Sequence, residues 1–95
     1  MNTSINLLEK LRIEINSLDV ILISTLAKRM KVSTAIGVYK KEQNLPLLDK
    51  KRWKVVIQTR MKAGKLKGLD SRFIQELFDV IHKHSLLVQE KVKRA

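Results

Sequence analysis

The chain has 95 residues, with 20 Lys and Arg against 9 Asp and Glu, and its formal net charge is +11 at pH 7. Hydrophobic residues make up 44% and charged residues 31%, which excludes a disordered chain and predicts a single domain over residues 1–95. The absence of cysteine excludes disulfides and thiolate chemistry. The charge indicates an anionic partner: nucleic acid, acidic lipid or a small polyanion.

The first predicted element is one long helix from Leu8 to Tyr39. Its apolar residues alternate spacings of three and four over about four heptads, as in coiled coils. The two heptad columns are Leu8, Ile15, Leu22, Arg29, Ile36 and Leu11, Leu18, Thr25, Val32, Tyr39. Asn6 followed by Glu9 predicts a capped start. At about 50 Å this helix would be longer than a compact domain of this size, so we expect it to pack against a second chain.

Two further helices are predicted after a break at residues 43–46, which include the only proline. Asp49 is placed to cap a short second helix, which we expect to end at Gly64 and Gly68. Asp70 is placed to cap a third helix of medium length. The apolar stripe of the third helix comprises Ile74, Leu77, Phe78, Ile81, Val88 and Val92. The predicted fold class is all-α, with a long, a short and a medium helix.

Three basic residues of the long helix are candidates for anion binding. Arg29 occupies a heptad column, where its guanidinium loses hydration worth several kcal/mol unless an anion or a hydrogen-bond network replaces the water. A register-setting residue or an arginine that reaches the surface explains it equally well. Lys40 lies about three turns further on nearly the same face, and a solvated lysine is the alternative there. Arg12 flanks the seam, where an interface-edge arginine would also fit.

Polar residues also interrupt the third helix and start the second. Ser85 and Gln89 are four residues apart and therefore share one face, where they either bond to each other in a core or line a polar cavity. Asp49 and Arg52 form a helix-start pattern that is common and needs no function.

The sequence pattern predicts no metal site, no membrane span and no secretory leader. His82 and His84 are two residues apart on a predicted helix and therefore diverge, so we expect no metal site. The longest apolar runs, such as Val20–Ile23, are too short to span a bilayer, and no basic leader precedes an apolar block. We expect a cytoplasmic protein that spans no membrane.

Taken in order, the residues resemble the all-helical chorismate mutase family from about Leu7 to Gln89. The resemblance rests on Leu11-Arg12, Ile15, Leu18-Asp19, Leu26 to Met30, Ile36-Gly37, Tyr39-Lys40, Pro46, Asp49, Arg52, Gly68 to Asp70, Phe73-Ile74, Leu77-Phe78, Ile81-His82, Ser85 and Gln89. No single motif in this set is specific for the family. The whole set, in this order and at these separations, is specific for it.

The resemblance implies a cofactor-free enzyme of the shikimate pathway, in aromatic amino-acid biosynthesis, that rearranges the dianion chorismate to prephenate. The implied fold is an intertwined homodimer with antiparallel long helices and two shared sites. Arg29 and the partner subunit's Arg12 would each pair with a substrate carboxylate. Lys40 and Gln89 would donate to the ether oxygen, where negative charge grows as the carbon–oxygen bond breaks.

The resemblance also implies that Asp49 and Arg52 shape the rim near the ring hydroxyl and that Ser85 bonds a carboxylate. One departure concerns Trp53, because the family commonly has a glutamate at this position that accepts from the ring hydroxyl. Tryptophan cannot accept such a bond. Either backbone groups near Asp49 hold the hydroxyl, or Trp53 closes the pocket by shape, or the substrate is a close relative of chorismate.

Three other functions remain open. One is a purely structural helical adaptor, which would leave the polar residues on the apolar stripes unexplained. An isochorismate pyruvate-lyase would share the fold and the cationic site. A basic helical nucleic-acid-binding protein would explain the charge, including the basic segments Lys62–Lys67 and Lys91–Arg94, but aromatic residues are scarce and no binding motif is present. We therefore do not expect nucleic acid as the partner. A larger enzyme of the same pathway is a further possible partner.

Overall fold

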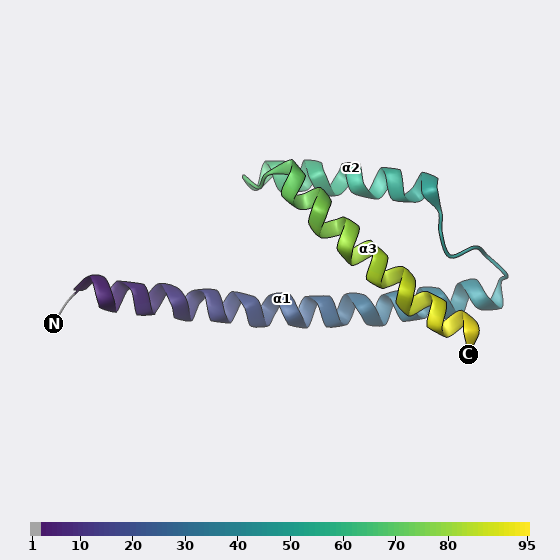
Figure 1. The fold of residues 1–95 in the computed structure, drawn as a ribbon, viewed down its shortest axis with the longest axis horizontal. Helices are drawn as coiled ribbons and strands as arrows, with labels where there is room; N and C mark the ends of the chain where they lie inside the picture. The colour runs from purple at the N-terminus through teal and green to yellow at the C-terminus, as the bar shows by residue number, and fades with distance from the viewer. Residues whose placement is uncertain (1–2) are drawn as a thin grey trace. The chain divides into compact units, whose positions relative to one another are not determined.

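The computed structural model describes residues 3–95, with side chains from Asn6 onward. It contains three helices, α1 (Thr3–Glu42), α2 (Lys50–Leu66) and α3 (Ser71–Arg94), and no strand within the described residues (Figure 1). The predicted all-α fold class and the order of a long, a short and a medium helix are confirmed.

The chain divides into two compact units, residues 1–31 and residues 32–95. The described part of the first unit is a stretch of α1 alone. Leu26 and Met30 are half-buried there, and the other large apolar side chains are exposed. Among them are Ile13 at 61%, Leu18 at 63% and Ile21 at 62% of full exposure. Large apolar side chains on a helix are normally buried against another element. The second unit holds the end of α1, all of α2 and α3, and every buried residue among those whose side chains the structure describes. The prediction of one domain over residues 1–95 stays a prediction.

Helix α1 confirms the predicted long helix but begins earlier than the pattern indicated. Asn6 lies inside α1, so its prediction as a cap is wrong. The helix continues back to Thr3 because residues 3–6 contain no proline or glycine to end it. Glu9, the expected reciprocal carboxylate, accepts instead from the Arg12 guanidinium at 3.1 Å, one turn along the helix.

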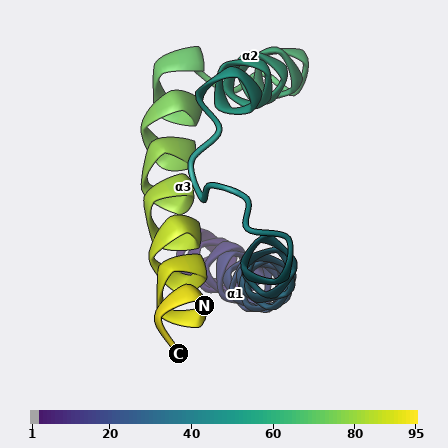
Figure 2. The ribbon, with the colours of Figure 1, turned by 90° about the vertical axis from the view of Figure 1, so that its right-hand side faces the viewer.

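The end of α1 and the start of α2 are joined by a short connection (Figure 2). Asn44 has a left-handed backbone, with φ of 54°, which is common just past a helix end. Leu45 N–H then donates to the Lys40 carbonyl at 2.8 Å. Asp49 caps α2 as predicted, because its Oδ1 accepts from the Arg52 backbone N–H at 3.0 Å.

The two glycines predicted to end α2 have different roles. Gly68 follows the helix with φ of 78°, and it confirms the prediction at that position. Gly64 lies inside α2 and is buried, so its prediction as a helix end is wrong. A Cβ at Gly64 would be 2.5 Å from Ile74 Cγ1. The glycine is therefore needed for close packing of α2 on α3, rather than for a turn.

Helix α3 packs its apolar stripe against its neighbours in the second unit. Asp70 caps it as predicted, with Oδ2 accepting from Phe73 N–H at 3.2 Å. Val56 of α2 and Ile74 of α3 are the buried hydrophobic residues, at 8% and 5% exposure. Half-buried apolar residues continue the α3 stripe: Phe78, Ile81, Val88 and Val92. This small core holds α2 and α3 together and sets the position of the polar residues further along α3.

Candidate active site

Lys40 and Gln89 were predicted to act together, and the structure brings them together from α1 and α3. The Lys40 ammonium donates to Gln89 Oε1 at 3.3 Å and to the Leu47 carbonyl at 2.6 Å. An ammonium only donates, so the amide oxygen of Gln89 must face Lys40 and its NH₂ group is turned elsewhere. Lys40 has three N–H groups, of which one remains for a ligand.

The close approach of α1 to α3 at this point depends on Gly37. A Cβ at Gly37 would be 3.0 Å from Gln89 Cα and 3.3 Å from Gln89 Cβ and Cγ. Ser33, one turn before Gly37, is also buried, at 5% exposure. Sequence reasoning gave neither residue a role of its own. The available signal was the spacing of Ser33, Gly37 and Lys40, which places two small residues and a lysine on one face of a helix.

Ser85 and Gln89 are both buried, at 7% and 6% exposure. Each makes a polar contact within the chain, so this polar stripe on α3 is satisfied rather than orphaned. His82 lies one turn before Ser85 and extends the stripe. Its imidazole stacks on the Trp53 indole of α2, with ring centroids 3.8 Å apart and planes 7° apart. The polar stripe of α3 thus runs from an aromatic pair at His82 to a lysine contact at Gln89.

Asp49 and Arg52 stand at the first turn of α2, and the structure assigns them a local role. The Asp49 carboxylate caps the helix through the Arg52 backbone N–H, and both residues are exposed. This capping contact is common at helix starts and requires no ligand. Their expected place at the rim of a site stays a prediction.

Arg12 and Arg29 belong to the first unit. Arg12 pairs with Glu9 on the surface, with side chains 62% and 61% exposed, and such a pair contributes about 0–1 kcal/mol. Arg12 can therefore exchange this partner for another at little cost. Arg29 lies in the heptad column as predicted and has a polar or electrostatic partner within the chain. Neither arginine is placed relative to Lys40 or Gln89, so their substrate contacts stay predictions.

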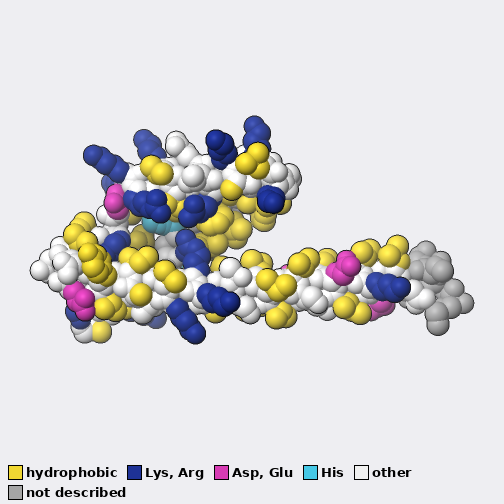
Figure 3. All heavy atoms as spheres, turned by 180° about the vertical axis from the view of Figure 1, so that it is seen from behind, with side chains coloured by type: hydrophobic (Ala, Val, Ile, Leu, Met, Phe, Trp, Pro, Cys, Tyr) yellow, Lys and Arg dark blue, Asp and Glu magenta, His cyan; other side chains and the backbone are white. Residues whose placement is uncertain are grey.

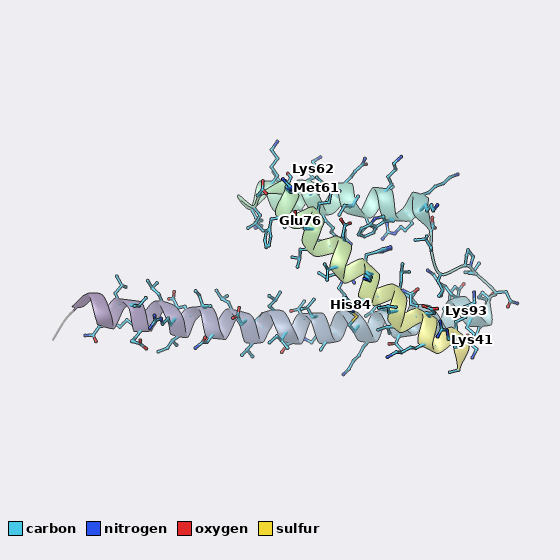
Figure 4. All side chains as sticks on the ribbon, viewed as in Figure 1. Lys41, Met61, Lys62, Glu76, His84 and Lys93 are labelled. Atoms are coloured by element: carbon cyan, nitrogen blue, oxygen red, sulfur yellow. The ribbon has the colours of Figure 1, made fainter. Side chains whose placement is uncertain are left out.

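Positive charge follows α2, which contains Lys and Arg but no Asp or Glu. Figure 3 shows these dark blue side chains along the helix. At the other end of the second unit, Lys41 reaches the last turn of α3 and donates to the Val92 carbonyl at 3.4 Å (Figure 4). Among the described residues, no group of three potential ligands gathers for a metal ion. None of the three helices is long and apolar enough to cross a membrane.

Comparison with known families tests the resemblance that the sequence indicated. A family model described as chorismate mutase type II matches residues 11–90. The chain belongs to the chorismate mutase type II family. The resemblance noted from the ordered residues is therefore confirmed, and the matched segment includes every predicted site residue from Arg12 to Gln89.

The chain is similar to bifunctional proteins and to a protein of about its own length. It is 35% identical over 81 residues to a bifunctional chorismate mutase/prephenate dehydratase of Buchnera aphidicola from Schizaphis graminum, covering 85% of this chain and 21% of the relative. The corresponding Escherichia coli K12 protein is 33% identical over 88 residues, 93% of this chain and 23% of that protein. The chain thus spans about a fifth of the length of these bifunctional relatives. A 4-amino-4-deoxychorismate mutase of Streptomyces venezuelae is 30% identical over 90 residues, 95% of this chain and 87% of that protein.

Proposed function

We propose that this protein is a chorismate mutase that rearranges chorismate to prephenate. The Lys40–Gln89 contact carries the proposal, because it joins a half-buried donor of one helix to a buried donor of another. The reaction is an intramolecular rearrangement and needs no nucleophile. What the protein has to supply is a compact substrate conformer and donors aimed at the oxygen on which charge develops.

Both members of the pair are suited to stabilise that oxygen. Gln89 gives its amide oxygen to Lys40, which directs its NH₂ group away from the lysine, and Lys40 keeps one N–H beyond its two contacts. These donors are held before the substrate arrives, so little reorganisation is needed in the transition state. A charged donor beside a neutral one in a site closed to water would lower the barrier by several kcal/mol.

The substrate carboxylates are assigned to the remaining residues of the predicted site. Arg29 and the partner subunit's Arg12 each pair with one carboxylate, and Ser85 adds a hydroxyl. Guanidinium groups suit this role because they bind carboxylates through two parallel hydrogen bonds. Asp49 and Arg52 form the rim at the start of α2.

This arrangement requires an intertwined homodimer. The support comes from α1, whose heptad residues expose large apolar side chains in the single chain. They include Leu11 at 47%, Ile15 at 58%, Leu18 at 63%, Leu22 at 56%, Val32 at 59% and Tyr39 at 58% exposure. Apolar heptad residues over about four heptads pack against a second helix that has the same repeat. The α1 helix of a second copy of this chain supplies such a helix. In an antiparallel pair the start of one α1 lies beside the middle of the other, so Arg12 and Arg29 of different subunits can meet.

The proposed substrate and partner enzyme are inferred from the relatives to which the chain is similar. Chorismate is the first candidate, and its 4-amino analogue is the second, because the relative from Streptomyces venezuelae is named for that substrate and matches nearly the whole chain. A larger enzyme of the same pathway is a candidate partner, since the other relatives carry a prephenate dehydratase in the same protein. A cytoplasmic location stays a prediction.

The proposed function and the proposed dimer are tested together, by an activity assay and a measurement of molecular mass. Purified protein is mixed with chorismate, the loss of chorismate absorbance is followed, and sedimentation gives the mass of the active species. We expect turnover and a mass of twice 11.0 kDa. Release of pyruvate from isochorismate, without loss of chorismate, would favour the lyase instead. Inertness toward chorismate, its 4-amino analogue and isochorismate, with the protein folded by circular dichroism, would reject the proposal.

A further inference from the structure

Ser33 is a buried hydroxyl residue of α1, at 5% exposure. It lies one turn before Gly37 and two turns before Lys40, so the three residues share one face of the helix. Gly37 lies against Gln89, and Lys40 donates to Gln89 Oε1. Ser33 is therefore on the face of α1 that contacts Gln89, one turn further from the lysine than Gly37.

The Gln89 amide is held at its oxygen but not at its nitrogen. Lys40 donates to Oε1, whereas the NH₂ group has no acceptor within the part of the chain whose side chains the structure describes. The NH₂ group is on the branch of the amide turned away from Lys40. Ser33 likewise lies on the far side of Gly37 from Lys40. An unused acceptor and an unused donor are thus on the same side of one helix contact.

The oxygen of Ser33 is available to accept a hydrogen bond. Ser33 Oγ forms no hydrogen bond with any residue from Asn6 to Ala95. Over the same residues, every side-chain nitrogen or oxygen that is fully closed to solvent has a partner. Ser33 Oγ and the Gln89 nitrogen therefore both border open space, although their residues are buried at 5% and 6% exposure. Unpaired polar groups in such positions cost free energy, which a hydrogen bond between the two would recover.

We propose that Ser33 is a positioning residue for Gln89. In the substrate complex the Ser33 oxygen accepts one N–H of Gln89, and the other N–H is directed at the ether oxygen of the substrate. The inference rests on the proposed function and deepens it. Only two side chains have to turn, and the terminal torsion of a glutamine is broad. With Lys40 on the amide oxygen and Ser33 on the nitrogen, the amide cannot turn over and present its oxygen to the growing negative charge.

Ser33→Ala tests this role in the chemical step. The change removes the acceptor and keeps a good helix former, so the fold should be retained. We expect kcat for chorismate to fall about twofold to tenfold, as for loss of one hydrogen bond, with KM nearly unchanged. The ether oxygen gains charge only in the transition state, which is why kcat and not KM responds. Ser71→Ala removes a half-buried hydroxyl about 27 Å from Gln89 along α3 and should keep the wild-type kcat.

A double-mutant cycle separates positioning of Gln89 from packing. Gln89→Met keeps a side chain of similar length without the amide and should itself lower kcat. In that background Ser33→Ala should have no further effect, because the group that Ser33 positions is gone. An equal fold-change of kcat in both backgrounds would overturn the inference. A rise in KM at constant kcat would also overturn it, since the hydroxyl would then bind the substrate in its ground state.

Nuclear magnetic resonance tests the hydrogen bond itself, without turnover. The chain has four glutamines, of which Gln43, Gln58 and Gln75 are exposed, so the NH₂ protons of Gln89 are those of the buried one. A bicyclic dicarboxylate that mimics the transition state is bound to protein labelled at the glutamine side-chain nitrogens. We expect slow hydrogen exchange at both Gln89 N–H groups, and faster exchange at one of them in Ser33→Ala. The three exposed glutamines should exchange equally fast in both proteins.

The outcomes distinguish this inference from the proposed function. Gln89 exchange that is the same in wild-type protein and Ser33→Ala, or that changes only in Ser85→Ala, would overturn the positioning role of Ser33. Unchanged kcat in Ser33→Ala would overturn it as well. In each case turnover of chorismate by the wild-type protein leaves the proposed function standing. A folded wild-type protein that is inert toward chorismate would overturn the proposed function, and this inference with it.

Discussion

Gly37 of α1 lies directly against the backbone of Gln89 on α3, so that a Cβ at position 37 would be 3.0 Å from Gln89 Cα. The contacted atom belongs to the backbone of a helix and cannot move without its neighbours. This close approach is what lets Gln89 Oε1 accept from Lys40 one turn further along α1. A residue without a side chain therefore sets the distance between the two proposed donors.

Enlarging residue 37 should damage activity more than folding. Gly37→Val pushes Gln89 away from Lys40, and a displacement of about 1 Å in a site costs on the order of 10² in rate. We expect kcat to fall by about that factor while circular dichroism still shows a helical protein. Ala63→Val, which also places a valine in a helix but at an exposed position of α2, serves as the control and should keep its activity. Full activity in Gly37→Val would contradict the positioning role.

Lys40 should be needed for the chemical step. Lys40→Ala removes the charged donor, and we expect kcat to fall by about 10²–10³, as for loss of one preorganised donor elsewhere. The adjacent Lys41 donates to carbonyls of Val92 and Ala95 instead, so Lys41→Ala controls for loss of one positive charge. Steady-state kinetics with chorismate measure both variants. Comparable rates in the two would remove Lys40 from the mechanism.

Asp49 should act mainly as a helix cap. Asp49→Ala should lower the free energy of unfolding by about 0.5–2 kcal/mol, and Asp49→Ser, which can also cap, should recover most of it. Asp70→Ala, the equivalent change at the start of α3, should cost a similar amount. Urea unfolding measures the stability and an activity assay accompanies it. Restored stability without restored activity in Asp49→Ser would show that the carboxylate itself reaches the substrate.

The heptad seam of α1 should hold the proposed dimer together. Leu18→Glu places a charge in that seam, where burial without a partner costs several kcal/mol, so we expect the sedimenting mass to fall to that of one chain. Activity should fall with it, because the shared sites are lost. Val55→Glu introduces the same charge at a similarly exposed apolar residue of α2 and should leave the mass unchanged. A dimeric Leu18→Glu protein would place the interface elsewhere.

Gly64 should be required for the packing of α2 on α3. A Cβ there would be 2.5 Å from Ile74 Cγ1, so Gly64→Ala should destabilise the protein by about 1–3 kcal/mol despite the better helix propensity of alanine. In an Ile74→Ala background the clashing atom is gone and the added methyl should be tolerated. A double-mutant cycle in urea measures this coupling. Additive costs would show that the two residues do not interact.

The sequence by itself determined the three helices, the caps at Asp49 and Asp70, and the family. Each depends on residues close together in the chain: heptad spacing for α1, a capping carboxylate for α2 and α3, and a proline for the break between α1 and α2. Local patterns fix local backbone structure, because the hydrogen bonds and side-chain contacts involved span only a few residues. The same reasoning failed at Asn6 and Gly64, where a residue that is compatible with a helix end lies inside a helix.

Only the tertiary structure decided what those residues contact. Gly64 is a packing residue because Ile74 lies over it, and Gly37 is one because Gln89 does. Likewise, the stacking of Trp53 on His82 joins residues 29 positions apart, and no spacing rule predicts such a contact. These relationships depend on how two helices approach each other. That approach is set by the shapes of side chains on both helices at once, which a pattern read along one chain does not contain.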